Sequence, residues 1–260
     1  MAQQSVDNWA FPPIIELLTI DSTNNYALTL LKEMNLTSRQ EIKHGAAVFA
    51  HDQFAGKGQR GKTWHSKAGE NIHLSIIIDP KKIGLQRQFL LSAIVSLAVR
   101  RFFEKYAQSD ISIKWPNDIF FRDRKAGGIL IENLISGADW KWAVVGIGLN
   151  INQVAFASVT DRQPVSLRQI TGKQFDCLAL AEELRNDVMC FFEKTVSETS
   201  AQTLMENYNQ FLYKKGETAC FEKDGERFEA IVKAVLPSGQ LVLQTDMDLP
   251  FEFGEINWVL

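Results

Sequence analysis

The sequence contains little cysteine, no long hydrophobic run and almost no net charge. Its three cysteines, Cys177, Cys190 and Cys220, are far apart and match no metal-ligand spacing, so we expect reduced thiols in the core. The longest apolar stretch, residues 89–99, is too short to cross a bilayer. The N-terminus lacks the basic start and apolar core of a secretion signal. A net charge of −3 gives no general attraction to nucleic acid. These absences predict a soluble, cytoplasmic globular protein.

The periodicity of the apolar residues predicts a mixed α+β fold. Apolar residues recur at helical spacing after Ser22, after Asp176 and over residues 203–211, which predicts a helix in each place. Residues 86–106 are apolar on nearly every side, which predicts a helix packed against a sheet. Short strand-like runs separated by tight turns leave no room for helical crossovers, which favours antiparallel neighbours. The predicted strands of this part are 46–53, 72–78, 111–115, 119–121, 128–135 and 142–150.

The character of the chain changes near residue 213. Beyond it, short alternating runs are separated by Asp-Gly and Pro-Ser-Gly turns, which is typical of a small all-β barrel. The expected barrel strands are 228–235, 240–244, 251–253 and 256–259. The sequence therefore predicts two domains, a larger α+β domain over residues 1–213 and a barrel over residues 214–260.

Residues 56–63 match the nucleotide-binding P-loop pattern, with the sequence GKGQRGKT. A P-loop needs a helix directly after it, because the helix N-terminus meets the phosphates. Here the segment WHSKAGEN and the alternating run IHLSIII follow instead, so the loop is predicted to join two strands. Its glycines still allow backbone N–H groups to bind anions, and Lys57, Arg60 and Lys62 add positive charge. A solvated basic hairpin is the alternative for this segment alone.

Four further segments carry polar groups or glycines at strand and helix ends. They are DSTN at 21–24, KWPND at 114–118, KAGGIL at 125–130 and VGIGLN at 145–150. Glycines inside a strand indicate that another group packs closely on the backbone. Each segment has an ordinary structural interpretation, such as a capped helix or a tight turn. Their order and spacing together are far more specific.

Together with the loop GKGQRGKTW, these segments resemble the biotin protein ligase family over roughly residues 15–260. The resemblance is to the type without an N-terminal DNA-binding domain. It implies a catalytic α+β domain related to class II aminoacyl-tRNA synthetases and lipoate ligases, followed by an SH3-like barrel. It also implies that biotin and ATP form biotinyl-5′-AMP with Mg²⁺, and that biotin then passes to a lysine of a biotin carboxyl carrier protein.

The resemblance implies roles for particular residues. Lys125 is expected between the biotin carboxylate and the phosphate, with further catalytic roles for Lys114, Lys57 and Asp118, and Asp118 is the candidate metal ligand. The expected biotin contacts are Ser22, Thr23, Asn24, Gln53, Lys57, Gly58, Gln59, Trp64, Lys125, Gly128, Leu130, Gly146 and Gly148. The expected ATP contacts are Arg60, Lys62, Asn117 and Asn150, the last of them with adenine.

The glycine-rich loop departs from the family at two positions. The family usually has arginine where this chain has Lys57 and Gln59, and glutamine loses the charge altogether. Arg60 or Lys62 could compensate, and the sequence does not decide between them. The nearby residues His51, His65 and His73 are interpreted as structural or solvated. A lipoate-type ligase, a non-catalytic biotin sensor and a P-loop hydrolase are the alternatives for function.

Some family members carry a helix-turn-helix domain that binds DNA. Only twenty residues precede the first motif at Asp21, whereas an independent domain rarely folds below about 40 residues. This segment has neither lysine nor arginine to contact phosphates. We therefore expect no sequence-specific DNA binding and no membrane association. The oligomeric state, with a homodimer as one option, and the identity of the acceptor carboxylase stay open.

Overall fold

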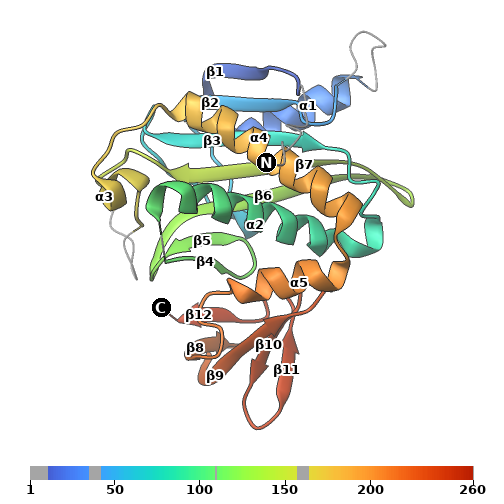
Figure 1. The fold of residues 1–260 in the computed structure, drawn as a ribbon, viewed down its shortest axis with the longest axis vertical. Helices are drawn as coiled ribbons and strands as arrows, with labels where there is room; N and C mark the ends of the chain where they lie inside the picture. The colour runs from blue at the N-terminus through green and yellow to red at the C-terminus, as the bar shows by residue number, and fades with distance from the viewer. Residues whose placement is uncertain (1–10, 35–41, 109, 157–163, 260) are drawn as a thin grey trace, which may run out of the picture.

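The computed structural model describes residues 11–34, 42–108, 110–156 and 164–259. A seven-stranded mixed sheet forms the centre, in the order β1-β2-β3-β7-β6-β5-β4 (Figure 1). Strands β1 and β2 are parallel, and the other neighbours are antiparallel. The strands are β1 (Ile14–Ile20), β2 (Ala47–Gln53), β3 (Asn71–Ile78), β4 (Ile111–Lys114), β5 (Asp118–Phe121), β6 (Arg124–Ser136) and β7 (Asp139–Asn150). The predicted antiparallel arrangement of the later strands is confirmed.

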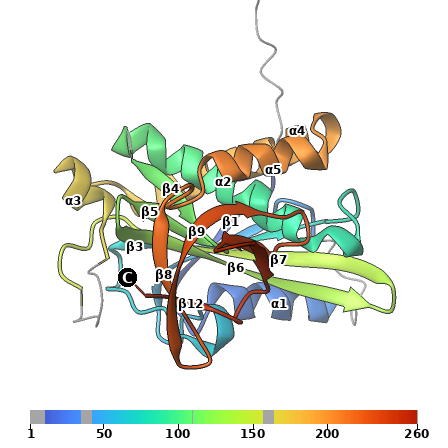
Figure 2. The ribbon, with the colours of Figure 1, turned by 90° about the horizontal axis from the view of Figure 1, so that it is seen from below.

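Helices cover both faces of this sheet (Figure 2). The long helices α2 (Gln88–Ala107) and α4 (Cys177–Glu198) lie on one face, and the predicted burial of the apolar stretch in α2 is confirmed. Helix α1 (Thr23–Met34) lies on the other face, where Ala27 and Leu31 pack in a small buried cluster with strand residues. Because α1 covers only part of its face, the remainder is available for a site.

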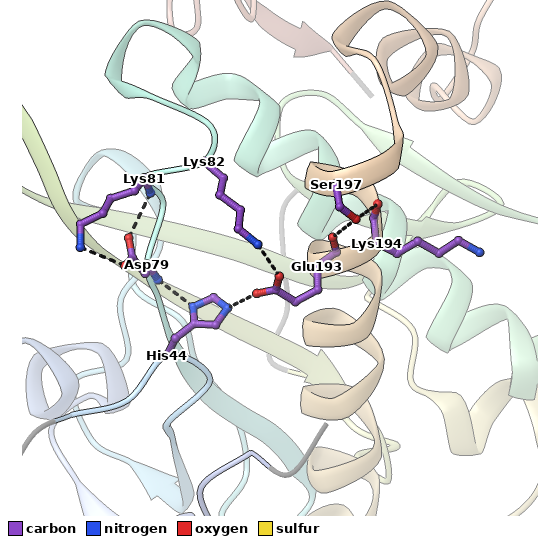
Figure 3. A network of polar contacts seen from close by, with 7 residues as sticks. All are labelled: His44, Asp79, Lys81, Lys82, Glu193, Lys194 and Ser197. Atoms are coloured by element: carbon purple, nitrogen blue, oxygen red, sulfur yellow. Dashed lines mark hydrogen bonds and ion pairs between the residues drawn. The ribbon is translucent and has the colours of Figure 1, made fainter. Parts of the chain in front are cut away.

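Helix α4 is tied to the sheet by a polar network (Figure 3). His44 Nε2 lies 2.8 Å from Glu193 Oε1 of α4, and Lys82 Nζ lies 2.9 Å from the other carboxylate oxygen. The backbone N–H of Asp79 donates to His44 Nδ1 at 2.8 Å. Nδ1 is therefore an acceptor, so the ring proton is on Nε2 and points at Glu193. This network belongs to the scaffold.

A second sheet follows at the C-terminus, beyond the β4 edge (Figure 1). It has five antiparallel strands in the order β11-β10-β9-β8-β12. They are β8 (Thr218–Lys223), β9 (Glu226–Val235), β10 (Leu241–Gln244), β11 (Asp248–Phe251) and β12 (Asn257–Val259). Helix α5 (Ala201–Gln210) leads into it. Buried residues such as Phe221 and Leu243 belong to the same hydrophobic cluster as the large sheet. The division at residues 213 and 214, between α5 and β8, stays a prediction.

Several elements of the described residues were not anticipated, and strand β11 begins and ends earlier than the predicted strand 251–253. The edge strand β1 shows no clean alternation, because Leu18 is 79% exposed although it is apolar. The short helix α3 (Leu167–Thr171) and strand β8 were not anticipated either. The expectation that all cysteines lie in the core is wrong, since only Cys177 is buried and Cys190 is exposed. Residues 1–10 of the N-terminal segment lie outside the described residues. No described helix is long and apolar enough to span a membrane.

Candidate active site

A cavity of about 440 Å³ opens on the sheet face that α1 leaves uncovered. Its walls come from the start of α1, the glycine-rich loop (residues 56–63), strands β4 to β7, and the C-terminal sheet. Every residue expected to contact biotin lines this cavity, as do Lys114, Asp118, Asn117, Arg60 and Lys62. Segments up to about 240 residues apart are thus gathered in one place.

One end of the cavity is polar and uncharged. The backbone N–H and the hydroxyl of Thr23 both donate to Gln53 Oε1, at 2.7 and 3.0 Å. Ser75 Oγ lies 2.8 Å from the Thr23 hydroxyl and 2.6 Å from Asn24 Oδ1. Ser75 was missed, although a serine inside the apolar strand β3 is a signal that could have identified it. These contacts fix the side chains at the α1 N-terminus before any ligand binds.

Two glycines of β7 make room for neighbouring side chains. A Cβ atom on Gly146 would lie 2.3 Å from Asn24 Oδ1, and one on Gly148 would lie 2.9 Å from the Trp64 ring. The close packing predicted from these glycines is therefore present, and its partners are Asn24 and Trp64. With Leu130 of β6, the Trp64 ring gives this part of the cavity apolar walls.

The other end of the cavity concentrates charge. Lys125 Nζ lies 2.7 Å from Asp118 Oδ1, and Lys114 of β4 is directly opposite Asp118 in the strand register. Lys125 was expected just before a strand but lies inside β6. There a register shift against β5 pairs Phe120 with Lys125 and Ile119 with Gly127. The extra residue forms a bulge, a feature that reorients side chains near functional sites.

Burial is the main cause that lowers the pKa of Lys114; Asp118 raises it, and the positive charges of Lys125 and Lys62 lower it, so that the pKa is about 8. The Lys114 ammonium also lies 5.4 Å from the Phe120 ring and 5.5 Å from the Trp258 ring. A cavity end with three lysines and one carboxylate has excess positive charge. It is therefore suited to polyanions.

The glycine-rich loop lies between β2 and β3, which confirms the prediction that it joins two strands and rules out the P-loop alternative. A bridge joins Lys57 to Thr63, and the N–H of Trp64 donates to Gly56 O at 2.9 Å. Lys57 Nζ lies 3.7 Å from Glu132 Oε1, and the second oxygen of Glu132 accepts from Asn24 Nδ2 at 2.8 Å. Glu132 was not anticipated, because it lies in β6 beyond the KAGGIL segment.

The C-terminal sheet also contributes to the cavity wall, which the sequence did not predict in detail. Its lining residues are Phe253, Gly254, Ile256, Asn257 and Trp258. The Trp115 indole N–H donates to Gly239 O at 2.8 Å, and the Trp115 ring contacts Phe253 edge-on at 5.8 Å between centroids. The KWPND turn and the C-terminal sheet are thereby held together.

Asn150 is the one expected contact that does not line the cavity. It is buried, and its Nδ2 lies 3.3 Å from the carbonyl oxygens of both Lys125 and Val165. Its contact with adenine stays a prediction. Of the three histidines, His51 pairs with Glu16 at 2.7 Å. Burial lowers the pKa of His73, whose Nδ1 lies 3.1 Å from Ala50 O. Both contacts agree with the structural interpretation.

The fold and the cavity define an α+β protein whose cavity joins a neutral polar end to a cationic one, with walls from two sheets. Residues 18–150, just over half of the chain, match the model of the Biotin/lipoate A/B protein ligase family. The chain belongs to this family.

Several characterised proteins are similar over much of the chain. The bifunctional ligase/repressor BirA of Escherichia coli is 28% identical over 244 residues, which is 93% of this chain and 72% of that protein. The BirA of Bacillus subtilis is 31% identical over 66% of this chain, which spans 57% of that relative. The biotin--[acetyl-CoA-carboxylase] ligase of Paracoccus denitrificans is 32% identical over 62% of this chain and 65% of that protein.

Among solved structures, the biotin protein ligase from Aquifex aeolicus in complex with biotin and ATP has a TM-score of 0.76. It is 22% identical, and the match covers 96% of this chain and 99% of that one. The ligase from Leishmania major in complex with biotinyl-5-AMP has a TM-score of 0.63 at 24% identity over 92% of this chain. The biotin protein ligase fold, with both sheets, is therefore shared along nearly the whole chain.

Proposed function

We propose that this protein is an ATP-dependent biotin protein ligase. In the first step an oxygen of the biotin carboxylate attacks the α-phosphorus of ATP, which forms biotinyl-5′-AMP and expels pyrophosphate. In the second step a lysine amine of a biotin carboxyl carrier protein attacks the acyl carbon. An amide forms, AMP leaves, and the amine loses a proton. The name of the Paracoccus denitrificans relative, biotin--[acetyl-CoA-carboxylase] ligase, supports the transfer step. Similar structures in complex with biotin and ATP and with biotinyl-5-AMP support the adenylation step.

One observation carries this proposal. A single cavity joins a neutral polar end, built on Ser22, Thr23 and Gln53, to a cationic end built on Lys114 and Lys125. Biotin has a neutral ureido head with one acceptor and two donors, an apolar middle and a terminal carboxylate. Its chemical groups therefore follow the same order as the cavity, with Trp64 and Leu130 beside the apolar middle. The carboxylate would then meet the ATP phosphates among the lysines.

The lysines have distinct proposed tasks. Lys125 neutralises the charge that develops between the carboxylate and the α-phosphate, because its ammonium is fixed by Asp118 at 2.7 Å. Lys114 adds a second positive charge from the neighbouring strand, and Lys62 adds a third from the loop. The glycine-rich loop excludes water from the reactive anhydride.

The cavity also fits a magnesium ion bound with ATP. Magnesium usually takes one or two carboxylates besides phosphate oxygens, and Asp118 is the only carboxylate among the described lining residues of this cavity. Asp118 would hold the ion, which would neutralise phosphate charge. Among the described residues, no group of three His, Cys, Asp or Glu side chains could hold a metal by itself.

The test is to incubate the protein with labelled biotin, ATP, Mg²⁺ and a biotin carboxyl carrier domain. We expect label on the carrier lysine, with AMP and pyrophosphate formed only when biotin is present. Release of ADP and phosphate without biotin would contradict the proposal. Because the family model also includes lipoate ligases, lipoate with its own acceptor domain serves as the matched comparison. Preferential transfer of lipoate would favour that alternative.

A further inference from the structure

The tip of the glycine-rich loop contacts the C-terminal sheet. Arg60 Nη1 donates to the carbonyl oxygen of Gly254 at 3.0 Å, and the guanidinium centre lies 5.6 Å from the centre of the Phe253 ring. These partners belong to the C-terminal turn, residues 252–256, which joins β11 to β12. A contact across 194 positions of sequence bridges two walls of the same cavity.

The receiving turn is shaped for this arginine. Gly254 has a φ of +95°, and a Cβ atom at this position would lie 1.9 Å from Arg60 Nη1. Only glycine leaves that space. Phe253, which receives the guanidinium, rests edge-on against Trp115, whose ring is buried and hydrogen-bonded to Gly239. The turn is therefore held in place from the side of the KWPND segment.

The backbone of the glycine-rich loop also has a conformation that is specific to this contact. Arg60 itself has a φ of 54° and a ψ of 42°, a left-handed conformation that non-glycine residues rarely adopt. The loop hydrogen bond from the Gly58 N–H to Lys62 O, at 2.6 Å, closes the hairpin around it. No carboxylate of the described residues forms an ion pair with Arg60, and one of its five N–H donors is used. Its remaining donors and its charge are available at the cavity.

We propose that Arg60 and the C-terminal turn form a closing contact that holds the glycine-rich loop over the reaction intermediate. Arg60 is then a positioning residue, and the C-terminal sheet takes part in retaining biotinyl-5′-AMP as well as in folding. The inference rests on the proposed function. Its physical reason is that the anhydride hydrolyses or escapes unless the loop stays closed until the acceptor lysine arrives.

Gly254→Ala tests the contact directly. The added methyl group displaces the mobile end of the Arg60 side chain and leaves the catalytic lysines unchanged. The readout is the ratio of pyrophosphate released to biotin transferred to the carrier, with free biotinyl-5′-AMP measured by chromatography. We expect this ratio to rise by about tenfold, the effect of losing one hydrogen bond to a charged group. A loss of fold stability alone would lower both products and leave their ratio unchanged.

Gly225→Ala is the matched control. Gly225 lies between β8 and β9 of the same sheet, has a φ of +85°, and has open space where a Cβ atom would be. The Gly225→Ala substitution imposes the same backbone strain without touching Arg60. The ratio of pyrophosphate released to biotin transferred should therefore equal that of the unmodified protein. An equal rise in Gly225→Ala, or an unchanged ratio in Gly254→Ala, would overturn the inference.

Arg60→Ala removes the same contact from the loop side, so it tests the inference even if Gly254→Ala folds poorly. If both residues act through one contact, the ratio in the double variant should equal that of Arg60→Ala. Multiplied effects would show that the two residues act separately and would overturn the inference. The proposed function fails in a different way, because the unmodified protein would then release no biotin-dependent pyrophosphate at all.

Discussion

Replacing Lys114 with methionine should make the ligand-free protein more stable at neutral pH. Burial lowers the pKa of Lys114 from 10.5 to about 8, which corresponds to a cost of about 3 kcal/mol in the free energy of unfolding at pH 7. Methionine has a similar length and no charge to desolvate. Between pH 8 and pH 10.5 the unfolded chain keeps a proton that the folded protein has lost, so the stability of the unmodified protein rises with pH in that window.

The assay is urea unfolding of both proteins from pH 7 to pH 9.5. The advantage of Lys114→Met should shrink by about 2 kcal/mol over this range, because the cost of the buried charge is relieved as Lys114 loses its proton. Lys173→Met, at an exposed position, is the control and should show no such trend. A difference between Lys114→Met and the unmodified protein that is constant with pH would refute the reasoning.

The same pKa should govern the reaction of the free enzyme. Above pH 8 Lys114 becomes neutral, so kcat/KM for ATP should fall as the charge is lost. Lys114→Arg should remove this decline, because arginine stays charged in this range. If kcat/KM stays flat up to pH 9.5 in the unmodified protein, Lys114 does not contact the nucleotide as proposed.

Three further substitutions test the rest of the cavity. Lys125→Met should leave the fold intact and slow adenylate formation by about a hundredfold; near-normal adenylation in single-turnover assays would rule out its role. Gln59→Arg should slow the escape of biotinyl-5′-AMP, and an unchanged dissociation rate would show that another cation already fills this position. Gly148→Ala places a Cβ atom 2.9 Å from Trp64, so biotin binding by calorimetry should weaken by about tenfold; unchanged affinity would remove Trp64 from the pocket wall.

Much of the fold followed from local patterns. The apolar stretch at 86–106 predicted the buried helix α2, and the short spacing after residue 111 predicted antiparallel strands, because periodicity and turn length are local properties. The edge strand β1 escaped prediction because it pairs with one neighbour only and leaves Leu18 exposed. The rejection of a P-loop also followed from the sequence, since the segment after Thr63 lacks helical spacing.

The functional groups available to the site could likewise be predicted from the sequence. The motifs carry lysines, aspartates and strand glycines in a fixed order, and that composition does not depend on folding. What only the tertiary structure decided is which groups meet. The bulge in β6 brings Lys125 to Asp118, while the carbonyl groups of Lys125 and Val165 hold the Asn150 amide outside the cavity.

The roles of Ser75, Glu132 and Gly254 illustrate the same limit. Each is an ordinary residue in its own segment, and each acquires a role through a partner at least 50 positions away: Asn24 for both Ser75 and Glu132, and Arg60 for Gly254. The pKa of Lys114 has the same origin, because it is lowered mainly by burial in the folded chain and also by the charges of Lys125 and Lys62. The sequence by itself determined which chemistry is available. Long-range packing determined where its charges are desolvated and which contacts close the site, because distance and burial are properties of the folded chain.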